Sequence, residues 1–301
     1  MQKKKTPLLS VAALILLILA GTWYREHDGA KDGLEKAAGE WAEKVRIARD
    51  GETDALPRQG TDDPSQDSRQ HKGLEIPYLL DTENNTIIEH MGFTLSYNER
   101  RRIPNWVAYE LLDSELYGDF ERTNSFRPDP SFKGRQAYDS DYRGSGWDRG
   151  HMAPSADMKW SSQVQEECFY LTNICPQNHN LNAGVWNDLE KRVRAEARYY
   201  KTLWVVCGPV VDRNRYGTIG DNQVTVPDGF FKALLARRRD GEYISIGFYF
   251  PNEAGRGPLS GYAMSVNDLE ERIGMDLFYN LDPDVQEEVE GVFNPADWKI
   301  R

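Results

Sequence analysis

Apolar positions divide the chain into three parts. An almost wholly apolar run at residues 7–24 follows three lysines at positions 3–5. The chain is then polar up to about Gly73, with prolines and many charged side chains. From Leu74 onward, short apolar runs alternate with turn residues, as in a folded domain. We therefore expect a signal peptide or single transmembrane anchor in residues 1–25, a polar linker in residues 26–73 and a folded domain in residues 74–301.

Within residues 74–301, the pattern predicts both strands and helices. Strand-like runs are rich in β-branched and aromatic residues. They are residues 94–97, 106–111, 203–211, 223–226 and 243–250. Helices are expected at residues 161–167, 182–201 and 265–272. Ser265 is placed to cap the last helix, with Asp268 three residues further on.

The N-terminal segment predicts export. A basic start followed by an apolar run is typical of an export signal, and the lysines are expected to stay in the cytoplasm. The run of about eighteen residues is near the lower limit for spanning a bilayer. Trp23 and Tyr24 lie where interfacial aromatic residues belong. We favour an uncleaved membrane anchor over a cleaved signal peptide. Either would place the rest of the chain on the periplasmic or extracellular face.

The charge balance changes this picture little. A net charge of -11 is unfavourable for binding nucleic acid, because phosphate contacts need Lys and Arg. However, residues 26–75 carry thirteen acidic and eight basic residues, and residues 251–301 carry eleven and four. Residues 135–201 carry nine of each sign, so net charge neither supports nor excludes a polyanionic substrate. A mean hydropathy of -0.69 argues against several membrane spans.

Four polar residues have the chemistry for phosphodiester hydrolysis. His151, in the run Asp-Arg-Gly-His, has an imidazole with a pKa suited to a general base. Arg149 offers a two-pronged donor for a phosphate oxygen. Asn182 offers a carbonyl oxygen, a hard ligand suited to Mg²⁺. If a helix begins at Asn182, then Glu190, eight residues later, lies on the same broad face and can hold metal-bound water.

Each of these residues, taken alone, also has a structural explanation. A single histidine is more often a hydrogen-bonded structural residue, and an asparagine at a helix start is usually a cap. A zinc site of His151, Cys168, Cys175 and His179 is a rival, but its spacing lacks the short cysteine pair of structural zinc sites. We expect buried free thiols at the three cysteines, the third being Cys207, with a Cys168–Cys175 disulfide as the alternative.

The order of the motifs is more specific than any single residue. The segments are Tyr142-Arg-Gly-Ser-Gly-Trp-Asp-Arg-Gly-His-Met-Ala-Pro, Phe169-Tyr-Leu-Thr-Asn-Ile-Cys-Pro-Gln and Leu181-Asn-Ala-Gly-Val-Trp-Asn-Asp-Leu-Glu. Together they resemble the DNA/RNA non-specific endonucleases, nucleases with a ββα-metal active site that include endonuclease G-like enzymes. The resemblance is dense from Tyr142 to Glu190, and a softer similarity covers most of residues 96–252.

The resemblance implies a fold and a metal site. The fold is an α+β domain whose central antiparallel sheet carries a ββα-metal catalytic unit. His151 would be the general base, and Asn182 would be the sole direct protein ligand of a hydrated Mg²⁺, for which Mn²⁺ can substitute. Glu190 would act on the metal through a bound water.

The resemblance also implies supporting residues. Arg149 and Asn173 would belong to the catalytic group, and Gln177 would bind substrate. Family members use a further arginine upstream of the motif to contact phosphate. Arg122 and Arg127 both lie in the right region, and the sequence does not choose between them.

These residues predict a Mg²⁺-dependent, sugar-non-specific endonuclease that acts on DNA and/or RNA and leaves 5′-phosphate ends. Two alternatives stay open: a membrane-tethered nucleic-acid-binding module without catalysis, and a phosphodiesterase for a smaller substrate. The expected partners are nucleic acid and, through residues 1–25, a membrane. The sequence leaves a homodimer and an inhibitor protein open.

Overall fold

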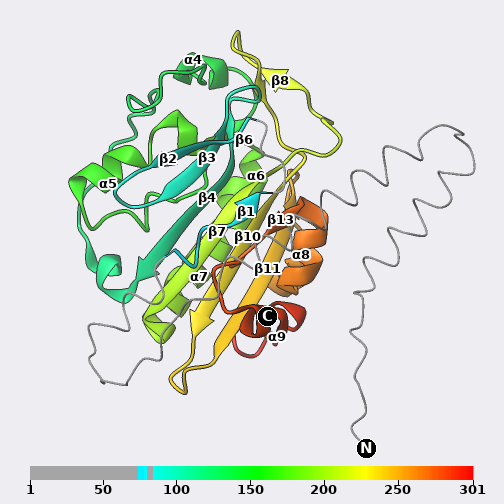
Figure 1. Cartoon of the computed structure of the whole chain (residues 1–301). Coiled ribbons are helices and arrows are strands. Elements are labelled where there is room, and N and C mark those ends of the chain that lie inside the picture. Colours follow the sequence, from blue (N-terminus) through cyan, green and yellow to red (C-terminus); the bar gives the residue numbers. More distant parts are fainter. Residues whose placement is uncertain (1–72, 80–83, 301) are drawn as a thin grey trace, which may run out of the picture. The chain divides into compact units, whose positions relative to one another are not determined.

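A seven-stranded antiparallel sheet forms the centre of the fold (Figure 1). The computed structural model describes residues 73–79 and 84–300. The strands follow the order β12-β11-β10-β7-β4-β3-β2 across the sheet. Their bounds are β2 Thr86–Glu89, β3 Thr94–Asn98, β4 Ile103–Leu112, β7 Thr202–Val210, β10 Gly229–Arg237, β11 Tyr243–Pro251 and β12 Ala263–Met264.

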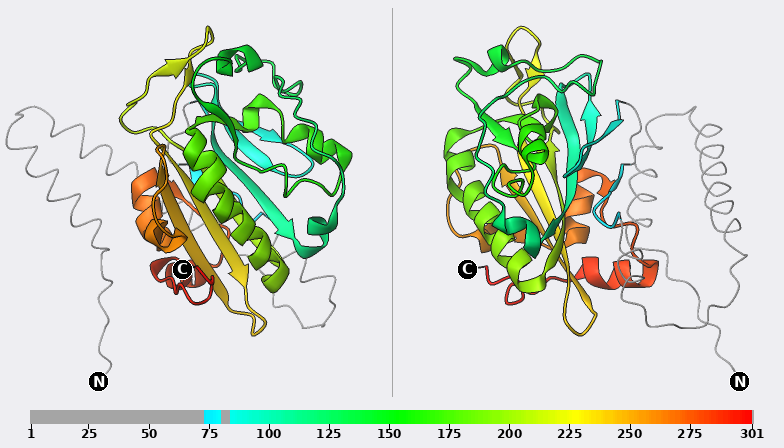
Figure 2. Two further views of the ribbon diagram at one scale, coloured as in Figure 1. Left: turned by 180° about the vertical axis from the view of Figure 1, so that it is seen from behind. Right: turned by 90° about the vertical axis from the view of Figure 1, so that its left-hand side faces the viewer.

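The sheet separates two hydrophobic cores. Side chains alternate along β7, so Val205 and Cys207 enter one core while Trp204 and Val206 enter the other. One face is covered by α5 (Ser162–Glu167) and α7 (Asn187–Tyr200), and the other by α8 (Val266–Ile273) and α9 (Pro283–Gly291). Figure 2 (right) shows α7 and α8 on opposite sides of the sheet. The central strands are therefore buried on both faces, which explains their continuous apolar runs.

Short elements connect these layers. The pairs are β1 (Tyr78–Leu79) with β13 (Met275–Asp276), β5 (Asp148–His151) with β6 (Ile174–Gln177), and β8 (Thr218–Ile219) with β9 (Val224–Thr225). The short helices are α4 (Asp139–Tyr142) and α6 (His179–Leu181), with 3₁₀ turns at Asp113–Tyr117, Leu171–Asn173 and Leu259–Tyr262.

The structure confirms the predicted α+β fold with a central antiparallel sheet. The helix expected at residues 182–201 is regular only from Asn187, because the backbone kinks at Gly184, and the strand expected at residues 223–226 shortens to β9, outside the central sheet. Ser265 caps α8, since its Oγ accepts a hydrogen bond from the Asp268 amide at 3.1 Å. The prediction missed β10, an inner strand of the sheet. The reason is Lys232, a charged residue in the middle of the strand that is nevertheless completely buried.

The signal peptide or anchor expected in residues 1–25 lies outside the described residues. Among residues 73–79 and 84–300, no helix has the length and apolar character needed to cross a membrane.

Three acidic side chains gather where α8, β13 and α9 meet. Glu290 is only 3% exposed, and burial together with the nearby Glu270 raises the pKa of its carboxyl to about 9. Burial also raises the pKa of Glu270 to about 7, and the pKa of Asp276 shifts in the same direction. The Gln286 amide donates to Asp276 at 2.7 Å and to Glu290 at 3.3 Å. The cluster therefore favours protonated carboxyl groups.

This cluster predicts a loss of stability in alkaline solution. Because folding raises the pKa of Glu290, its contribution is complete below the unfolded pKa of about 4.3 and is lost as the pH rises through about 9. Glu290→Gln is expected to raise the thermal unfolding midpoint at pH 9 and to change it little at pH 5. Glu287→Gln, at an exposed position of the same helix, is the control. Equal effects of Glu290→Gln at both pH values would contradict the assignment.

Candidate active site

The β5–β6 pair and the helix after it bring the predicted residues together. The antiparallel register sets His151 opposite Ile174 and Gly150 opposite Cys175. A Cβ atom on Gly150 would overlap the Gln177 side chain, so this position needs glycine for close approach. After β6, the chain enters α6, a kinked turn at Asn182–Trp186 in which Gly184 has non-helical backbone angles, and then α7.

His151 is held as a neutral base. Its side chain is buried, and among the described residues Nε2 has no hydrogen-bond partner. Burial and, second, the positive charge of Arg122 lower the pKa of His151 to about 3. The imidazole is therefore uncharged at neutral pH, with one nitrogen left for a ligand or a water molecule.

A stack of rings and cations includes this histidine. The His151 ring packs against Phe126 and Phe169 with centroid distances of 5.4 and 4.9 Å, and these two rings also contact each other edge-on at 5.0 Å. Arg149 lies over Phe126 at 5.4 Å, and Arg122 lies over Phe169 at 5.0 Å. Contacts of this kind favour a cation over an aromatic face. The sequence did not single out Phe126 and Phe169, because aromatic residues ordinarily indicate core.

Arg149 is fixed from the side of α4. Its Nε lies 2.7 Å from Asp139 Oδ1, and its Nη2 donates to the Asp139 carbonyl at 3.2 Å. Because the salt bridge is partly exposed, it contributes little to the free energy of unfolding, and its main effect is to orient the Arg149 guanidinium.

Asn182 is oriented by Asp148. The amide nitrogen of Asn182 donates to Asp148 Oδ2 at 3.0 Å, and His179 Nδ1 lies 2.9 Å from the same oxygen. Since the amide nitrogen is used, the carbonyl oxygen is the atom of Asn182 left for another ligand.

Glu190 lies on α7 beside buried charges. Burial raises the pKa of its carboxyl to about 7, the buried Lys232 opposes that shift, and Asp157 adds to it. Asp157 is itself paired with Arg194 at 2.8 Å and accepts from the Tyr109 hydroxyl at 3.0 Å. The Lys232 ammonium lies 4.9 Å from the Trp186 ring and has no hydrogen-bond partner in the described part of the chain.

The two amide residues of the motif differ in their roles. Asn173 is completely buried and fully used: it accepts from the Ala153 amide and donates to the carbonyls of Ala153 and Cys168, all at 2.8–2.9 Å. It therefore ties the end of β5 to α5. Both polar atoms of the Gln177 amide are buried with no partner among residues 73–79 and 84–300.

The structure separates the two upstream arginines. Arg122 stacks on Phe169 and acts electrostatically on His151. Arg127 instead lies 3.3 Å from Glu166 and stacks over Tyr170 at 4.9 Å. Only Arg122 of the two therefore contacts the ring stack at the site.

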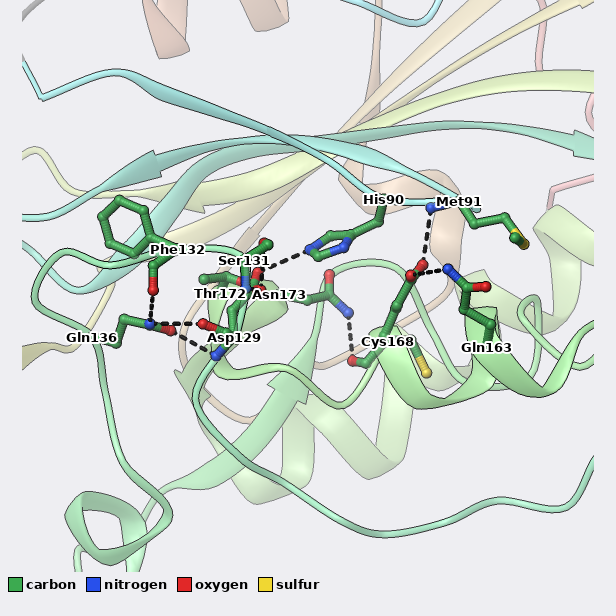
Figure 3. A network of polar contacts seen from close by, with 11 residues as sticks. His90, Met91, Asp129, Ser131, Phe132, Gln136, Gln163, Cys168, Thr172 and Asn173 are labelled. Atoms are coloured by element: carbon green, nitrogen blue, oxygen red, sulfur yellow. Dashed lines mark hydrogen bonds and ion pairs between the residues drawn. The ribbon is translucent and has the colours of Figure 1, made fainter.

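The segment between β4 and α4, which carries Arg122 and Phe126, is anchored at Asp129 (Figure 3). The buried Asp129 carboxylate accepts from Thr172 at 2.8 Å and from Ser131, and lies 2.9 Å from His90 Nε2. Burial alone would raise the pKa of Asp129, but these hydrogen bonds hold it at about 2. Thr172 directly precedes Asn173. Hydrogen bonds from Asp129 through Thr172 therefore connect this segment to Asn173, which holds the end of β5.

The donor set fits a hydrated hard cation better than zinc. No group of three or more His, Cys, Asp or Glu side chains within the described residues could hold a metal ion. The zinc-site rival is therefore not supported. A single amide oxygen, from Asn182, suits Mg²⁺, which keeps most of its waters. All three cysteines are buried free thiols, so the alternative Cys168–Cys175 disulfide is absent.

The α+β fold with its central antiparallel sheet and the ordered motifs are those of a family of nucleases. This chain belongs to the DNA/RNA non-specific endonuclease family, whose model matches residues 74–284.

Known relatives support this membership. The chain is 38% identical over 220 residues to "Nuclease EXOG, mitochondrial" from Homo sapiens, covering 68% of this chain and 59% of that protein. It is 32% identical over 223 residues to "Nuclease" from Nostoc sp., covering 69% of this chain and 79% of that one. The match thus spans about three-fifths of the length of the EXOG relatives.

A solved structure has a similar fold. The chain superposes on the "Crystal structure of the EndoG/EndoGI complex: Mechanism of EndoG inhibition" with a TM-score of 0.62 at 28% identity, covering 66% of this chain and 87% of that one.

The Asp129 anchor predicts a local effect of substitution. Asp129→Ala removes one partner of a buried pair, which is expected to lower the free energy of unfolding by about 3–5 kcal/mol. It is also expected to expose residues 118–138 to limited proteolysis. Denaturant titration and mass spectrometry of early fragments measure the two effects. Ser131→Ala, which removes only a peripheral hydrogen bond, is the control. A protease pattern identical to the wild type would show that Asp129 does not anchor this segment.

Proposed function

We propose that this protein is a metal-dependent endonuclease that hydrolyses phosphodiester bonds in DNA and/or RNA. The observation that carries the proposal is the neutral, buried His151, whose Nε2 has no partner among the described residues and whose ring packs against two aromatic rings that each contact an arginine. A base, cationic groups for phosphate and an oxygen ligand for a metal are the components that this reaction needs.

In the proposed mechanism His151 takes a proton from the attacking water. Its low pKa keeps the imidazole neutral in the resting state, with one ring nitrogen unprotonated. Packing against Phe126 and Phe169 restricts the ring, which limits the loss of entropy on reaching the transition state. Arg122 is proposed to bind the phosphate oxygens, and Arg149, fixed by Asp139, to stabilise the charge that develops on them.

The proposed cofactor is Mg²⁺, with Mn²⁺ as a substitute. The Asn182 carbonyl would hold it directly, and Glu190 would orient one of its waters. Bound there, the metal would supply a Lewis acid that stabilises negative charge on phosphorus and on the departing 3′ oxygen, which leaves a 5′-phosphate. Asp148 keeps the Asn182 amide in the orientation that this role requires. Asn173 and Gln177 complete the bracing around β5 and β6.

Contacts to phosphate carry no sequence information, so we propose nearly sequence-independent cleavage. A binding module without catalysis would need neither the unpartnered base nor the oriented amide, which disfavours that alternative. A smaller phosphodiester substrate is the remaining alternative. Export and membrane anchoring, predicted from residues 1–25, would place this activity on the periplasmic or extracellular face. EndoGI, in the similar solved complex, is a partner of that protein.

Chelation and two substitutions test this function. Purified protein is expected to cleave plasmid DNA or long RNA with Mg²⁺ and to lose that activity in EDTA. His151→Ala is expected to lower kcat by about 10²–10⁴, the usual contribution of a general base, with an unchanged unfolding midpoint. Asn182→Ala is expected to weaken both the rate and the Mg²⁺ dependence. Binding of nucleic acid without any cleavage would refute the nuclease, and cleavage of dinucleotides alone would favour the smaller substrate.

The two upstream arginines predict unequal effects. Arg122→Ala is expected to lower kcat/KM at least about tenfold, since it removes a cation beside the developing charge. Arg127→Ala is expected to change it less than about threefold, since Arg127 pairs with Glu166 and Tyr170 instead. Steady-state kinetics on one oligonucleotide measures both variants. A larger effect of Arg127→Ala would reverse the assignment.

A further inference from the structure

A basic cavity lies at one end of the sheet, and none of the candidate catalytic residues lines it. It has a volume of about 660 Å³. Its walls come from the β3–β4 turn, the end of β7, the β8–β9 hairpin and the end of α8 with β13. We call it the arginine groove.

Three arginines line the arginine groove without acidic partners. Arg100 and Arg101, from the β3–β4 turn, are exposed, and neither forms an ion pair in the described part of the chain. Arg272 lies over the Tyr249 ring at 3.5 Å and likewise has no carboxylate partner among those residues. Among the lining residues that belong to the described part of the chain, Asp212 carries the one carboxylate.

The three arginines lie around one cavity, although acidic residues outnumber basic ones in the chain, 48 to 37. Other exposed arginines in the described part of the chain, such as Arg198 and Arg239, also lack an ion pair, so the lack of a carboxylate partner alone does not mark a site. What favours an anionic ligand is the gathering of three such cations at one cavity.

The other lining groups also suit a phosphate chain. The Asn214 amide and the hydroxyls of Thr218 and Thr225 line the walls, whereas the Asn98 and Asn105 amides are used in hydrogen bonds to each other, to Ser96 and to the Asn84 carbonyl. Groups of these types contact phosphate and sugar in nucleic-acid complexes. None of the large exposed hydrophobic side chains in the described residues belongs to the lining, so the groove offers no platform for stacking bases.

The segment at residues 211–217 links the arginine groove to the catalytic side. Asp228 fixes this segment by accepting hydrogen bonds from the four amides of residues 212–215 at 2.8–3.1 Å. On one side of the segment, Tyr216 packs on Trp147, which precedes Asp148, at 5.1 Å. On the other side, Asp212 and Asn214 line the groove. The exposed Arg213 adds a further cation between the two sites.

We propose that the arginine groove binds the phosphate backbone of the nucleic-acid substrate, beyond the nucleotides held at the catalytic site. This proposal rests on the proposed nuclease function. The groove lengthens the contact with long substrates, independently of base sequence, and contributes nothing to the chemistry at His151. Its effect is therefore a preference for long chains.

The test measures binding and cleavage of two substrates by the full-length chain. One is a strand of about 30 nucleotides, longer than the ~4–16 nucleotides that a single small binding fold covers, and the other is a dinucleotide. The variant Arg100→Glu/Arg101→Glu is expected to raise Kd and KM for the long strand at least tenfold. It is expected to leave kcat and KM for the dinucleotide unchanged. The slope of log K against log[salt] is expected to fall by about 1 for each phosphate that the variant no longer neutralises.

Two controls define the outcome. Arg239→Glu makes the same kind of charge change at an exposed arginine in the β10–β11 turn, at the other end of the sheet, and is expected to have less than a threefold effect. Arg100→Lys/Arg101→Lys keeps the charge and is expected to retain most of the binding. Equal losses on both substrates, or a long-strand Kd that matches Arg239→Glu, would overturn the proposal. Kd is measured in EDTA, and cleavage is measured separately with Mg²⁺. A wild-type protein that binds the long strand but does not cleave it with Mg²⁺ would refute the nuclease function, while the Kd values would still test the groove.

Discussion

The pairing of β5 with β6 is the constraint on which the candidate site depends. It fixes His151 in the β5–β6 pair and places Gly150 beside the Gln177 side chain. The chain then leads through α6 into the turn at Asn182–Trp186, which carries Asn182. Without this register the base and the amide oxygen would have no defined separation. Because the pair is only four residues long on each strand, its stability must come from the packing around it. The buried Asn173 amide, which ties the end of β5 to α5, provides part of that packing.

Around this pair, the site is assembled from parts of the chain that are distant in sequence. The long segment between β4 and α4 has almost no regular structure, yet it supplies Arg122 and Phe126 to the ring stack. Its position depends on one buried carboxylate, Asp129, and on a backbone bridge between Arg127 and Tyr170. Burial away from water lowers the pKa of a histidine, because it disfavours the charged form. At His151 aromatic rings provide this burial.

Much of the fold and the centre of the site could be predicted from the sequence, and the rest depends on tertiary contacts. Strands such as Leu203 to Val210 are apolar throughout, and the order of the motifs predicted the family to which the chain belongs. The sequence did not predict β10, because Lys232 lies in its middle and lysine is rarely buried completely, as it is in this inner strand. No sequence pattern distinguishes Phe126 and Phe169 from ordinary core residues, since their role comes from their contact with the His151 ring. The choice between Arg122 and Arg127 depends on where an irregular segment runs, which periodicity does not report.

The three buried thiols have a consequence for the environment in which this protein folds. Burial raises the pKa of Cys168 to about 12 and that of Cys207 to about 11, and the pKa of Cys175 shifts in the same direction. Oxidation and disulfide exchange proceed through the thiolate, which is scarce at such positions. The described domain needs no disulfide to hold it together, and its sulfur atoms are poor targets for oxidants. Its native state is therefore compatible with both reducing and oxidising surroundings, so the fold itself does not restrict the redox compartment in which the protein works.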